Sequence, residues 1–269
     1  MTGGLNEFDL EHKFFIGRGR YADVYRVKNI STGENFAMKI INLQYQTEPQ
    51  FFNEIEMLQT AQHPNLVGVR AAYIVDRTGY IVMKLCEGGT LSSKIATDGG
   101  IVETKATRYM KSILEAVAYL HSINIIHRDI KPDNIYFETT DDDSPILLGD
   151  FGLSKFLSEG VTVTRVGTPG YQSPQIIQGH LYTFKTDIWS VGVLTYTLLQ
   201  GIVPFNVRKI RSEGILLEMM RSGEYAFKLE VSAEAKDFIS KCLQFDESKR
   251  PSAIELLEHP WIKKYTDQH

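Results

Sequence analysis

Cysteine is scarce in this sequence, and the two cysteines present, Cys86 and Cys242, lie far apart. Because no Cys-x-x-Cys pair occurs, neither a disulfide framework nor a zinc site is expected. The chain also lacks a run of about 18 apolar residues, the length that a membrane span needs. Its N-terminus shows neither a secretory signal nor a myristoylation signal. These absences predict a protein without a membrane partner, located in the cytoplasm, with the nucleus as the alternative.

A basic excess is missing as well, since the formal net charge is −4 and the sequence pI is about 6.0. Nucleic-acid-binding proteins are usually basic, so no nucleic-acid partner is expected. The 269 residues, 43% of them hydrophobic, are enough for one large domain or two lobes. The single charge run, Asp141-Asp142-Asp143, lies between two apolar runs. It predicts a solvated hairpin turn rather than a metal site.

Short apolar or β-branched runs predict strands in the first 85 residues, at 14–16, 24–27, 36–41, 66–73 and 80–85. One helix is expected among them, over residues 51–61. Its apolar residues Phe51, Ile55 and Leu58 recur at spacings of four and three. Pro64 ends it, because proline disfavours helix at the preceding residue.

The pattern becomes largely helical beyond Gly88-Gly89, which predicts a hinge. Helices are expected over residues 104–121, 187–199, 232–243 and 252–258, and the second is apolar nearly all round, which predicts burial. A strand-rich part followed by a helix-rich part predicts an α+β fold of two lobes. The N-lobe is expected over about 8–85, the hinge over about 84–89 and the C-lobe over about 90–265.

A glycine turn follows the first predicted strand, at Ile16-Gly17-Arg18-Gly19. Without side chains at Gly17 and Gly19, backbone N–H groups can approach phosphate oxygens closely. An ordinary hairpin is the better explanation of this motif when it is taken alone. A dinucleotide-binding fingerprint is disfavoured, because no helix follows.

Lys39 lies inside an apolar strand and must place its ammonium group in polar surroundings. It either extends to solvent or binds phosphate oxygens and pairs with a carboxylate. Glu54 is the preferred partner, because it lies four residues before Leu58 on the helix side that leads toward the core. Glu56 is a second candidate by charge alone, but it points elsewhere.

The densest polar group is His127-Arg128-Asp129-Ile130-Lys131-Pro132-Asp133-Asn134, followed by Asp150-Phe151-Gly152. Asp129 can accept a hydroxyl proton, and Lys131 can stabilise phosphoryl charge. Asn134 and Asp150 offer hard oxygens, the ligand type that Mg²⁺ prefers. A solvated turn explains the group poorly, because apolar residues bracket it.

These motifs, in this order, resemble those of the eukaryotic protein kinases over residues 8–265. Gly88-Gly89-Thr90-Leu91 and His259-Pro260-Trp261 are most similar to the calcium/calmodulin-dependent kinase group. The resemblance implies a β-rich N-lobe, an α-helical C-lobe and transfer of the γ-phosphoryl group of ATP, with Mg²⁺, to protein Ser/Thr hydroxyls. Protein substrates and an upstream activating kinase are the implied partners. A pseudokinase-like ATP-binding scaffold and a small-molecule kinase of related fold are the alternatives.

The same resemblance implies the role of each residue. Asp129 orients the substrate hydroxyl and accepts its proton, Lys131 contacts the γ-phosphate, and Lys39, paired with Glu54, holds the α- and β-phosphates. Asn134 and Asp150 hold Mg²⁺. The implied nucleotide contacts also include the phosphate-covering Gly17 and Gly19 and, around the adenine, Ile16, Val24, Ala37, Met83, Cys86 and Tyr136.

Residues 154–173 resemble an activation segment rich in hydroxyl groups, among them Ser158. Thr164 lies where related kinases carry an activating phosphate, and Arg128 can pair with that phosphate through a bidentate contact. The alternative is that Thr164 is never modified. Thr168 is expected to contact Asp129 and Lys131.

Several positions depart from the kinase pattern. Ala22 replaces the last loop glycine, and Lys84 replaces the usual acid at the start of the hinge. Gln175 stands where a glutamate usually pairs with an arginine, matched here by Arg250. A buried arginine without its carboxylate predicts reduced thermal stability. Acids that recognise basic substrates are replaced as well, by Thr90 and Thr197. Because Asp133 remains, only a weak preference for Arg or Lys upstream of the target is expected.

Overall fold

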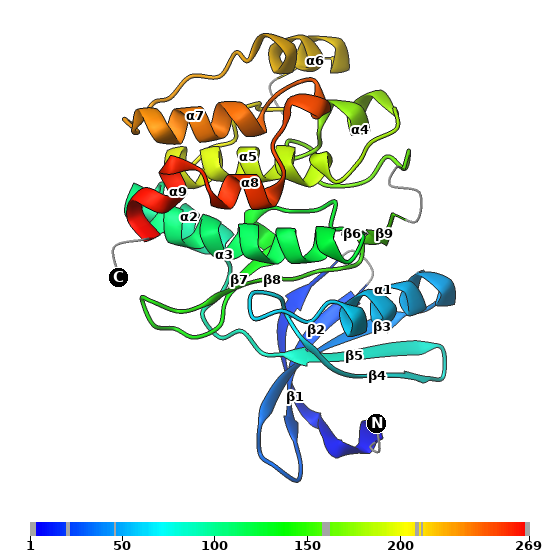
Figure 1. Cartoon of the computed structure of the whole chain (residues 1–269). Coiled ribbons are helices and arrows are strands. Elements are labelled where there is room, and N and C mark those ends of the chain that lie inside the picture. The colour runs from blue at the N-terminus through cyan, green and yellow to red at the C-terminus, as the bar shows by residue number, and fades with distance from the viewer. Residues whose placement is uncertain are drawn as a thin grey trace.

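The computed structural model describes residues 4–19, 22–45, 47–157, 162–207, 210 and 212–266. Its N-terminal part is a five-stranded antiparallel sheet with one helix, and helices form most of the remainder (Figure 1). The predicted α+β fold of two lobes is therefore confirmed. Arg20 and Tyr21 of the glycine turn, and Ser158 of the activation segment, lie outside the described residues.

The N-terminal sheet has the strand order β1-β2-β3-β5-β4. A 3₁₀ turn at Leu5–Glu7 precedes it, and its strands are β1 (Phe8–Arg18), β2 (Ala22–Asn29), β3 (Asn35–Asn42), β4 (Val69–Val75) and β5 (Thr78–Lys84). In its register Val24 lies opposite Lys39, and Ala37 lies opposite Met83. Four residues predicted to contact the nucleotide are thus brought onto neighbouring strands.

The strand predicted over residues 66–73 is wrong at its start. Leu66 closes a turn with His63 and forms only an isolated parallel bridge with Leu148. The sheet strand β4 begins at Val69 and continues to Val75. An apolar run alone did not reveal that its first residues pair with a different part of the chain.

Helix α1 (Glu48–Thr60) packs on the sheet. It begins with Pro49 in its first turn, and the Gln50 side chain accepts a hydrogen bond of 3.0 Å from the Thr47 N–H. Phe51 is fully buried, and a Cβ atom on Gly79 of β5 would lie 2.5 Å from its ring. Gly79 therefore allows α1 to approach the sheet closely, which fixes the position of Glu54.

The C-terminal part is built around α5 (Lys185–Gln200), which is buried along nearly its whole length, as predicted. It packs against α3 (Glu103–Ser122) and α7 (Ala233–Cys242). Ser232 caps α7 and Ser252 caps the helix that follows it, since each hydroxyl accepts an N–H of the first turn. The other helices are α2 (Leu91–Asp98), α4 (Pro174–Gln178), α6 (Glu213–Ser222), α8 (Ala253–Leu257) and α9 (Pro260–Thr266), with 3₁₀ turns at Pro132–Asn134 and Glu247–Lys249.

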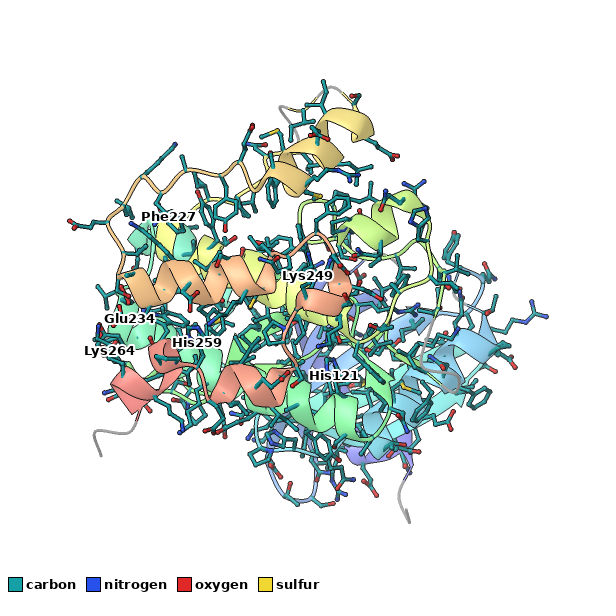
Figure 2. The ribbon with its side chains drawn as sticks, turned by 45° about the horizontal axis from the view of Figure 1, so that its top comes forward. His121, Phe227, Glu234, Lys249, His259 and Lys264 are labelled. Carbon is teal, nitrogen blue, oxygen red and sulfur yellow. The ribbon has the colours of Figure 1, made fainter. Side chains whose placement is uncertain are left out.

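The C-terminal helix α9 is held by packing and by ion pairs at its edge. Trp261 is fully buried, and its indole N–H donates to Glu103 on α3 at 2.9 Å. Figure 2 shows Glu234 on α7 beside Lys264 on α9, a pair separated by 2.8 Å. Because exposed ion pairs contribute little, buried Trp261 is the main anchor of this helix.

Two pairs of short strands support the loops between the large elements. Strand β6 (Ile125–Ile126) pairs with β9 (Lys155–Phe156), and β7 (Ile135–Phe137) pairs with β8 (Ile146–Leu148). The segment 141–143 lies in the connection between β7 and β8, so the predicted hairpin turn is confirmed. Within the described ranges, no helix is long and apolar enough to cross a membrane.

Candidate active site

The ammonium group of Lys39 lies at the centre of a charged network. It is 2.6 Å from a Glu54 carboxylate oxygen and 3.6 Å from one of Asp150. Only 17% of the Lys39 side chain is exposed, and Glu54 is buried whereas Glu56 is exposed. The predicted Lys39–Glu54 contact is therefore present, and the alternative that Lys39 extends into solvent is wrong.

The charges of this network stabilise one another. Burial opposes the charge of Lys39, but the carboxylates of Glu54 and Asp150 outweigh it and raise the pKa of Lys39. Partial burial opposes the charge of Asp150 in the same way, yet Lys39 and the Gly152 N–H lower the pKa of Asp150. Lys39 and Asp150 are therefore both ionised near neutral pH, and the site presents a fixed cation beside a fixed anion.

Asp187 on α5 anchors the loop that carries Asp129. It is fully buried and accepts hydrogen bonds from the backbone N–H groups of His127, at 2.9 Å, and of Arg128, at 2.8 Å. Burial disfavours the Asp187 carboxylate, but its contact with His121 at 2.9 Å helps to lower the pKa of Asp187. Arg128 has a φ of 67°, a conformation that a non-glycine residue adopts only when its surroundings impose it.

The Asp129 carboxylate is held on three sides. It accepts hydrogen bonds from the Thr168 hydroxyl at 2.6 Å and from the Asn134 amide at 2.9 Å, and Lys131 lies at 2.8 Å. Lys131 also donates to the Thr168 hydroxyl at 2.6 Å. The expected contacts of Thr168 with Asp129 and Lys131 are thus present. They fix the orientation of the carboxylate, which general-base chemistry requires.

Asn134 and Asp150 fit a site for Mg²⁺ completed by phosphate oxygens. The Asn134 amide N–H₂ donates to both the backbone and the carboxylate of Asp129, and its oxygen has no partner among the described residues. The described part of the chain contains no group of three or more His, Cys, Asp or Glu residues that could hold a metal. Mg²⁺ does not need one, because it is usually bound by one or two protein ligands together with waters and substrate phosphates.

Of the residues predicted around the adenine, four lie on strands of the N-terminal sheet and Cys86 follows soon after β5, where the chain leaves that sheet; the four are Ile16, Val24, Ala37 and Met83. Tyr136 on β7 packs beside Gly149, where a Cβ atom would lie 3.1 Å from the tyrosine ring. Burial raises the pKa of Tyr136 to about 12. The Gly19 N–H donates to the Ala22 carbonyl at 2.7 Å and closes the glycine turn.

A model of the protein kinase domain matches residues 10–262 of the sequence. The chain belongs to the protein kinase family. It is 36% identical to myosin light chain kinase A of Dictyostelium discoideum, over 94% of this chain and 88% of the relative. It is 36% identical to calcium/calmodulin-dependent protein kinase type 1 of Caenorhabditis briggsae, over 93% of this chain and 72% of the relative.

A third relative, calcium-dependent protein kinase 3 of Plasmodium berghei, is 37% identical over 98% of this chain, and the chain spans only 48% of that relative's length. The domain is therefore a Ser/Thr protein kinase of the calcium/calmodulin-dependent group, which uses ATP to phosphorylate proteins.

The segment that resembles an activation segment passes close to Arg128. Tyr182 connects the two, since its hydroxyl donates to the Thr164 carbonyl at 2.6 Å and lies 3.5 Å from the Arg128 guanidinium. The Arg128 Nε also donates to the Leu153 carbonyl at 2.6 Å. The Thr164 side chain is exposed, so its hydroxyl is accessible from solvent.

Sequence reasoning missed two basic residues of this segment. Lys155 on β9 lies 3.5 Å from the Thr162 hydroxyl, two residues before Thr164. Arg165 donates to the Ile177 carbonyl and, at 3.0 Å, to Glu213 on α6. The only available signal was a positive charge near Thr164, which does not identify a partner so distant in sequence.

Arg250 is fully buried and is satisfied mainly by oxygens without charge. It donates to the Gln175 side chain at 2.7 Å and to the carbonyls of Gln244, Lys185 and Phe245. Its guanidinium also lies 5.0 Å from the Trp189 ring. Burial lowers the pKa of Arg250 to about 10, because removing the guanidinium from water disfavours its charged form.

Replacing Gln175 by glutamate is expected to raise the melting temperature by about 2–4 °C for each kcal/mol gained from the new ion pair. The gain is limited, because the Gln175 amide also donates to the Phe245 carbonyl at 2.8 Å and glutamate cannot. Differential scanning calorimetry measures the shift. Gln178→Glu, on the same helix α4, is the matched control. A lower melting temperature for Gln175→Glu alone would contradict the prediction.

Cys86 is expected to react slowly with alkylating reagents in the native protein. Burial raises the pKa of its thiol to about 11, whereas an ordinary cysteine has a value of about 8.5. Because the thiolate is the reactive form, alkylation at about pH 8 should be roughly 10²-fold slower than in the unfolded chain. Mass spectrometry after timed iodoacetamide treatment measures the rate, with urea-unfolded protein as the control. Equal rates in both states would show that the thiol is not buried.

Proposed function

We propose that Asp129, Lys131, Lys39, Glu54, Asn134 and Asp150 form the catalytic site of this kinase domain, with Mg²⁺ as its cofactor. The observation that carries the proposal is the held Asp129 carboxylate, bonded to Thr168, Lys131 and Asn134. A carboxylate fixed beside a lysine is suited to receive a hydroxyl proton where phosphoryl charge develops. We take residues 8–265 as the domain that contains this site.

In this proposal the substrate hydroxyl oxygen attacks the γ-phosphorus of ATP, and the bond from that phosphorus to the β–γ bridging oxygen breaks. Asp129 accepts the hydroxyl proton, and Lys131 stabilises the negative charge of the transferred group. Lys39, kept charged and in place by Glu54, holds the α- and β-phosphates. Asn134 and Asp150 would hold Mg²⁺, which would neutralise the charge of the phosphates.

We also propose that the adenine lies between residues of β1–β3 and the hinge, against Tyr136. Tyr136 offers a stacking surface in the place where the family usually has leucine. Gly17 and Gly19 cover the phosphates in this arrangement. Ile16, Val24, Ala37, Met83 and Cys86 form its remaining contacts.

Recognition of basic substrates rests on Asp133 in this proposal. The Thr90 hydroxyl caps α2 by accepting the Ser93 N–H at 3.2 Å, and the Thr197 hydroxyl bonds to the Val193 carbonyl inside buried α5. The hydroxyl groups of both threonines therefore form hydrogen bonds within the fold. The exposed Asp133 carboxylate supports a weak preference for Arg or Lys upstream of the target.

The decisive experiment is a Mg²⁺-dependent kinase assay with Asp150→Asn. Wild type is expected to phosphorylate a positional peptide library with Mg²⁺-ATP and to stop when the metal is chelated. Asp150→Asn is expected to lower the rate about 10²-fold or more, because a metal ligand and its charge are lost. Asp76→Asn is the matched control, since both aspartates have positive φ, 45° and 59°, and asparagine tolerates that conformation.

The pseudokinase-like scaffold makes the opposite prediction. If wild type binds ATP but transfers no phosphate at any Mg²⁺ concentration, the catalytic proposal is wrong. We further propose a cytoplasmic or nuclear location, which microscopy of a fluorescent fusion tests. A fusion found solely in another compartment would overturn that part.

A further inference from the structure

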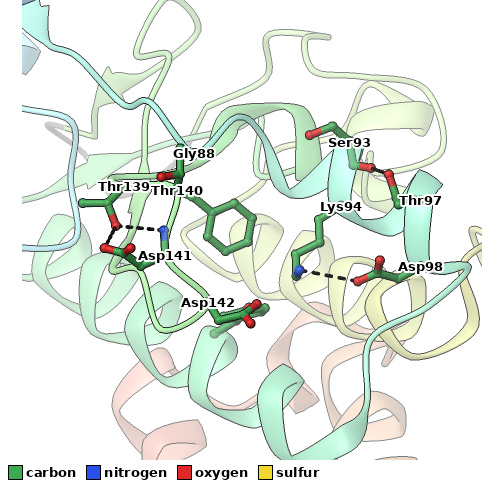
Figure 3. A pocket seen from close by; sticks show the side chains of 11 residues that line it. Gly88, Ser93, Lys94, Thr97, Asp98, Thr139, Thr140, Asp141 and Asp142 are labelled. Carbon is green, nitrogen blue, oxygen red and sulfur yellow. Dashed lines mark hydrogen bonds and ion pairs between the residues drawn. The ribbon is translucent and has the colours of Figure 1, made fainter.

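A small cavity lies outside the catalytic residues, between α2, α3 and the connection from β7 to β8 (Figure 3). Its volume is about 250 Å³, and it is lined by Gly88, Ser93, Lys94, Thr97, Asp98 and, across from them, Tyr109, Phe137 and residues 139–142. Sites for small molecules usually measure about 300–1,000 Å³. The cavity is therefore of a size for one side chain rather than for a nucleotide.

Tyr109 on α3 places an unpaired polar atom at this cavity. The residue is only 7% exposed, and its hydroxyl has no hydrogen-bond partner in the described part of the chain. Buried polar groups are nearly always paired, because an unpaired one loses its hydration without compensation. Burial also raises the pKa of Tyr109, so the hydroxyl stays protonated near neutral pH and can both donate and accept.

More carboxylate groups than cationic groups line the cavity. Lys94 pairs with Asp98 at 3.5 Å (Figure 3), and Lys105, which comes from outside the lining, pairs with Asp142 at 3.3 Å. The Asp141 side chain accepts only the Thr139 hydroxyl, at 3.0 Å, among the described residues. One carboxylate therefore has no cationic partner there.

Aromatic rings complete the wall. The rings of Tyr109 and Phe137 meet edge to face with centroids 5.5 Å apart, and Phe137 is buried. Aromatic faces attract cations, and arginine more often than lysine. A planar guanidinium with five donors can bond to a carboxylate and to a hydroxyl at once, whereas a compact ammonium is more strongly hydrated.

We propose that this cavity binds the guanidinium group of an arginine in a docking segment of a protein substrate. Asp141 and the Tyr109 hydroxyl accept its N–H groups, and the aromatic wall lies against its plane. The expected effect of this docking on catalysis rests on the proposed kinase function. Since no lining residue belongs to the proposed catalytic site, docking should change KM and leave kcat unchanged.

Binding is tested without nucleotide by NMR titration of the ¹⁵N-labelled domain with acetyl-Gly-Arg-Gly-amide. The amide signals of Thr139, Thr140 and Asp141 are expected to shift with the arginine peptide, less with its lysine analogue and not with its glutamate analogue. Asp141→Asn and Tyr109→Phe should each weaken binding at least several-fold. Asp76→Asn, an equal charge change in another exposed turn, should not.

Docking is tested with one acceptor peptide, alone or joined through Gly-Ser linkers of several lengths to an arginine-containing segment. For wild type, the joined peptide is expected to have a KM several-fold lower than the free acceptor, with equal kcat. Asp141→Asn should remove that difference and leave the KM of the free acceptor unchanged.

Several outcomes would contradict these proposals. Equal affinity of arginine and glutamate peptides, or binding unaffected by Asp141→Asn, would overturn the proposal. If Tyr109→Phe only raises the melting temperature and binding persists, the hydroxyl is an unpaired group and not part of a site. If no peptide binds, the cavity holds solvent alone and the proposal fails. Failure of wild type to phosphorylate the free acceptor would instead count against the catalytic proposal, while the NMR result stands by itself.

Discussion

Asp129→Asn is expected to lower kcat by about 10²–10⁴-fold, the range typical of losing a positioned general base. Asparagine keeps the size of the side chain and can still accept from the Thr168 hydroxyl, so the fold should persist. The affinity for ATP should remain largely unchanged, because Lys39, Glu54 and Asp150 do not depend on Asp129 for their contacts. Single-turnover kinetics and equilibrium nucleotide binding measure the two quantities separately.

Asp133→Asn in the same loop is the matched control. Its carboxylate is exposed and is expected to contact only a basic residue of the substrate. The variant should raise KM for a peptide with an upstream arginine while kcat stays near the wild-type value. An Asp129→Asn enzyme with wild-type kcat would refute the assignment of the base.

Thr164→Ala is expected to prevent activation by an upstream kinase. Tyr182 joins the Thr164 carbonyl to Arg128, and Lys155 lies 3.5 Å from the Thr162 hydroxyl, so a phosphate on Thr164 is expected to find a basic partner in one of them. A hydrogen bond to a charged group contributes about 1.5–3 kcal/mol, so losing one such contact should lower turnover about 10- to 100-fold. The measurement is kcat before and after treatment with an activating kinase, and after phosphatase.

Thr164→Ser is the control, because serine can carry the same phosphate in the same segment. It should retain activation, whereas Thr164→Ala should stay at the basal rate. Full activity of Thr164→Ala, or wild-type activity indifferent to phosphatase, would mean that Thr164 is not a regulatory site. The segment would then be ordered by Arg165, Tyr182 and their partners alone.

The sequence allowed the long elements to be predicted because their apolar periodicity is strong. Helix α3 presents one continuous buried stripe, and α5 is apolar on every side, so both are clear without tertiary information. Helix α6 was not predicted. It buries only Leu216 and Met220, and two apolar contacts four residues apart give a weak pattern. Helix α4, at Pro174–Gln178, is too short to repeat a pattern at all.

The residues that we propose for catalysis stand out in the sequence because they occur in compact motifs whose order is distinctive. Their mutual contacts follow from that order, as the Lys39–Glu54 pair illustrates. Tyr182 and Lys155 could not be predicted. Their roles depend on contacts with residues far along the chain or in irregular loops, which leave no periodic signal. The same holds for Tyr109, which in sequence is one more aromatic residue on a helix.

The packing of the Phe51 ring against Gly79 limits how the N-lobe can rearrange. Moving α1 far enough to separate Glu54 from Lys39 would remove the fully buried Phe51 ring from the space that Gly79 leaves open on the sheet. Exposing such a side chain to water costs about 1.5–3 kcal/mol. An outward swing of this helix is therefore a poorly populated state of the isolated domain. Compounds that need such a swing should bind it weakly, and control should pass chiefly through the segment near Thr164.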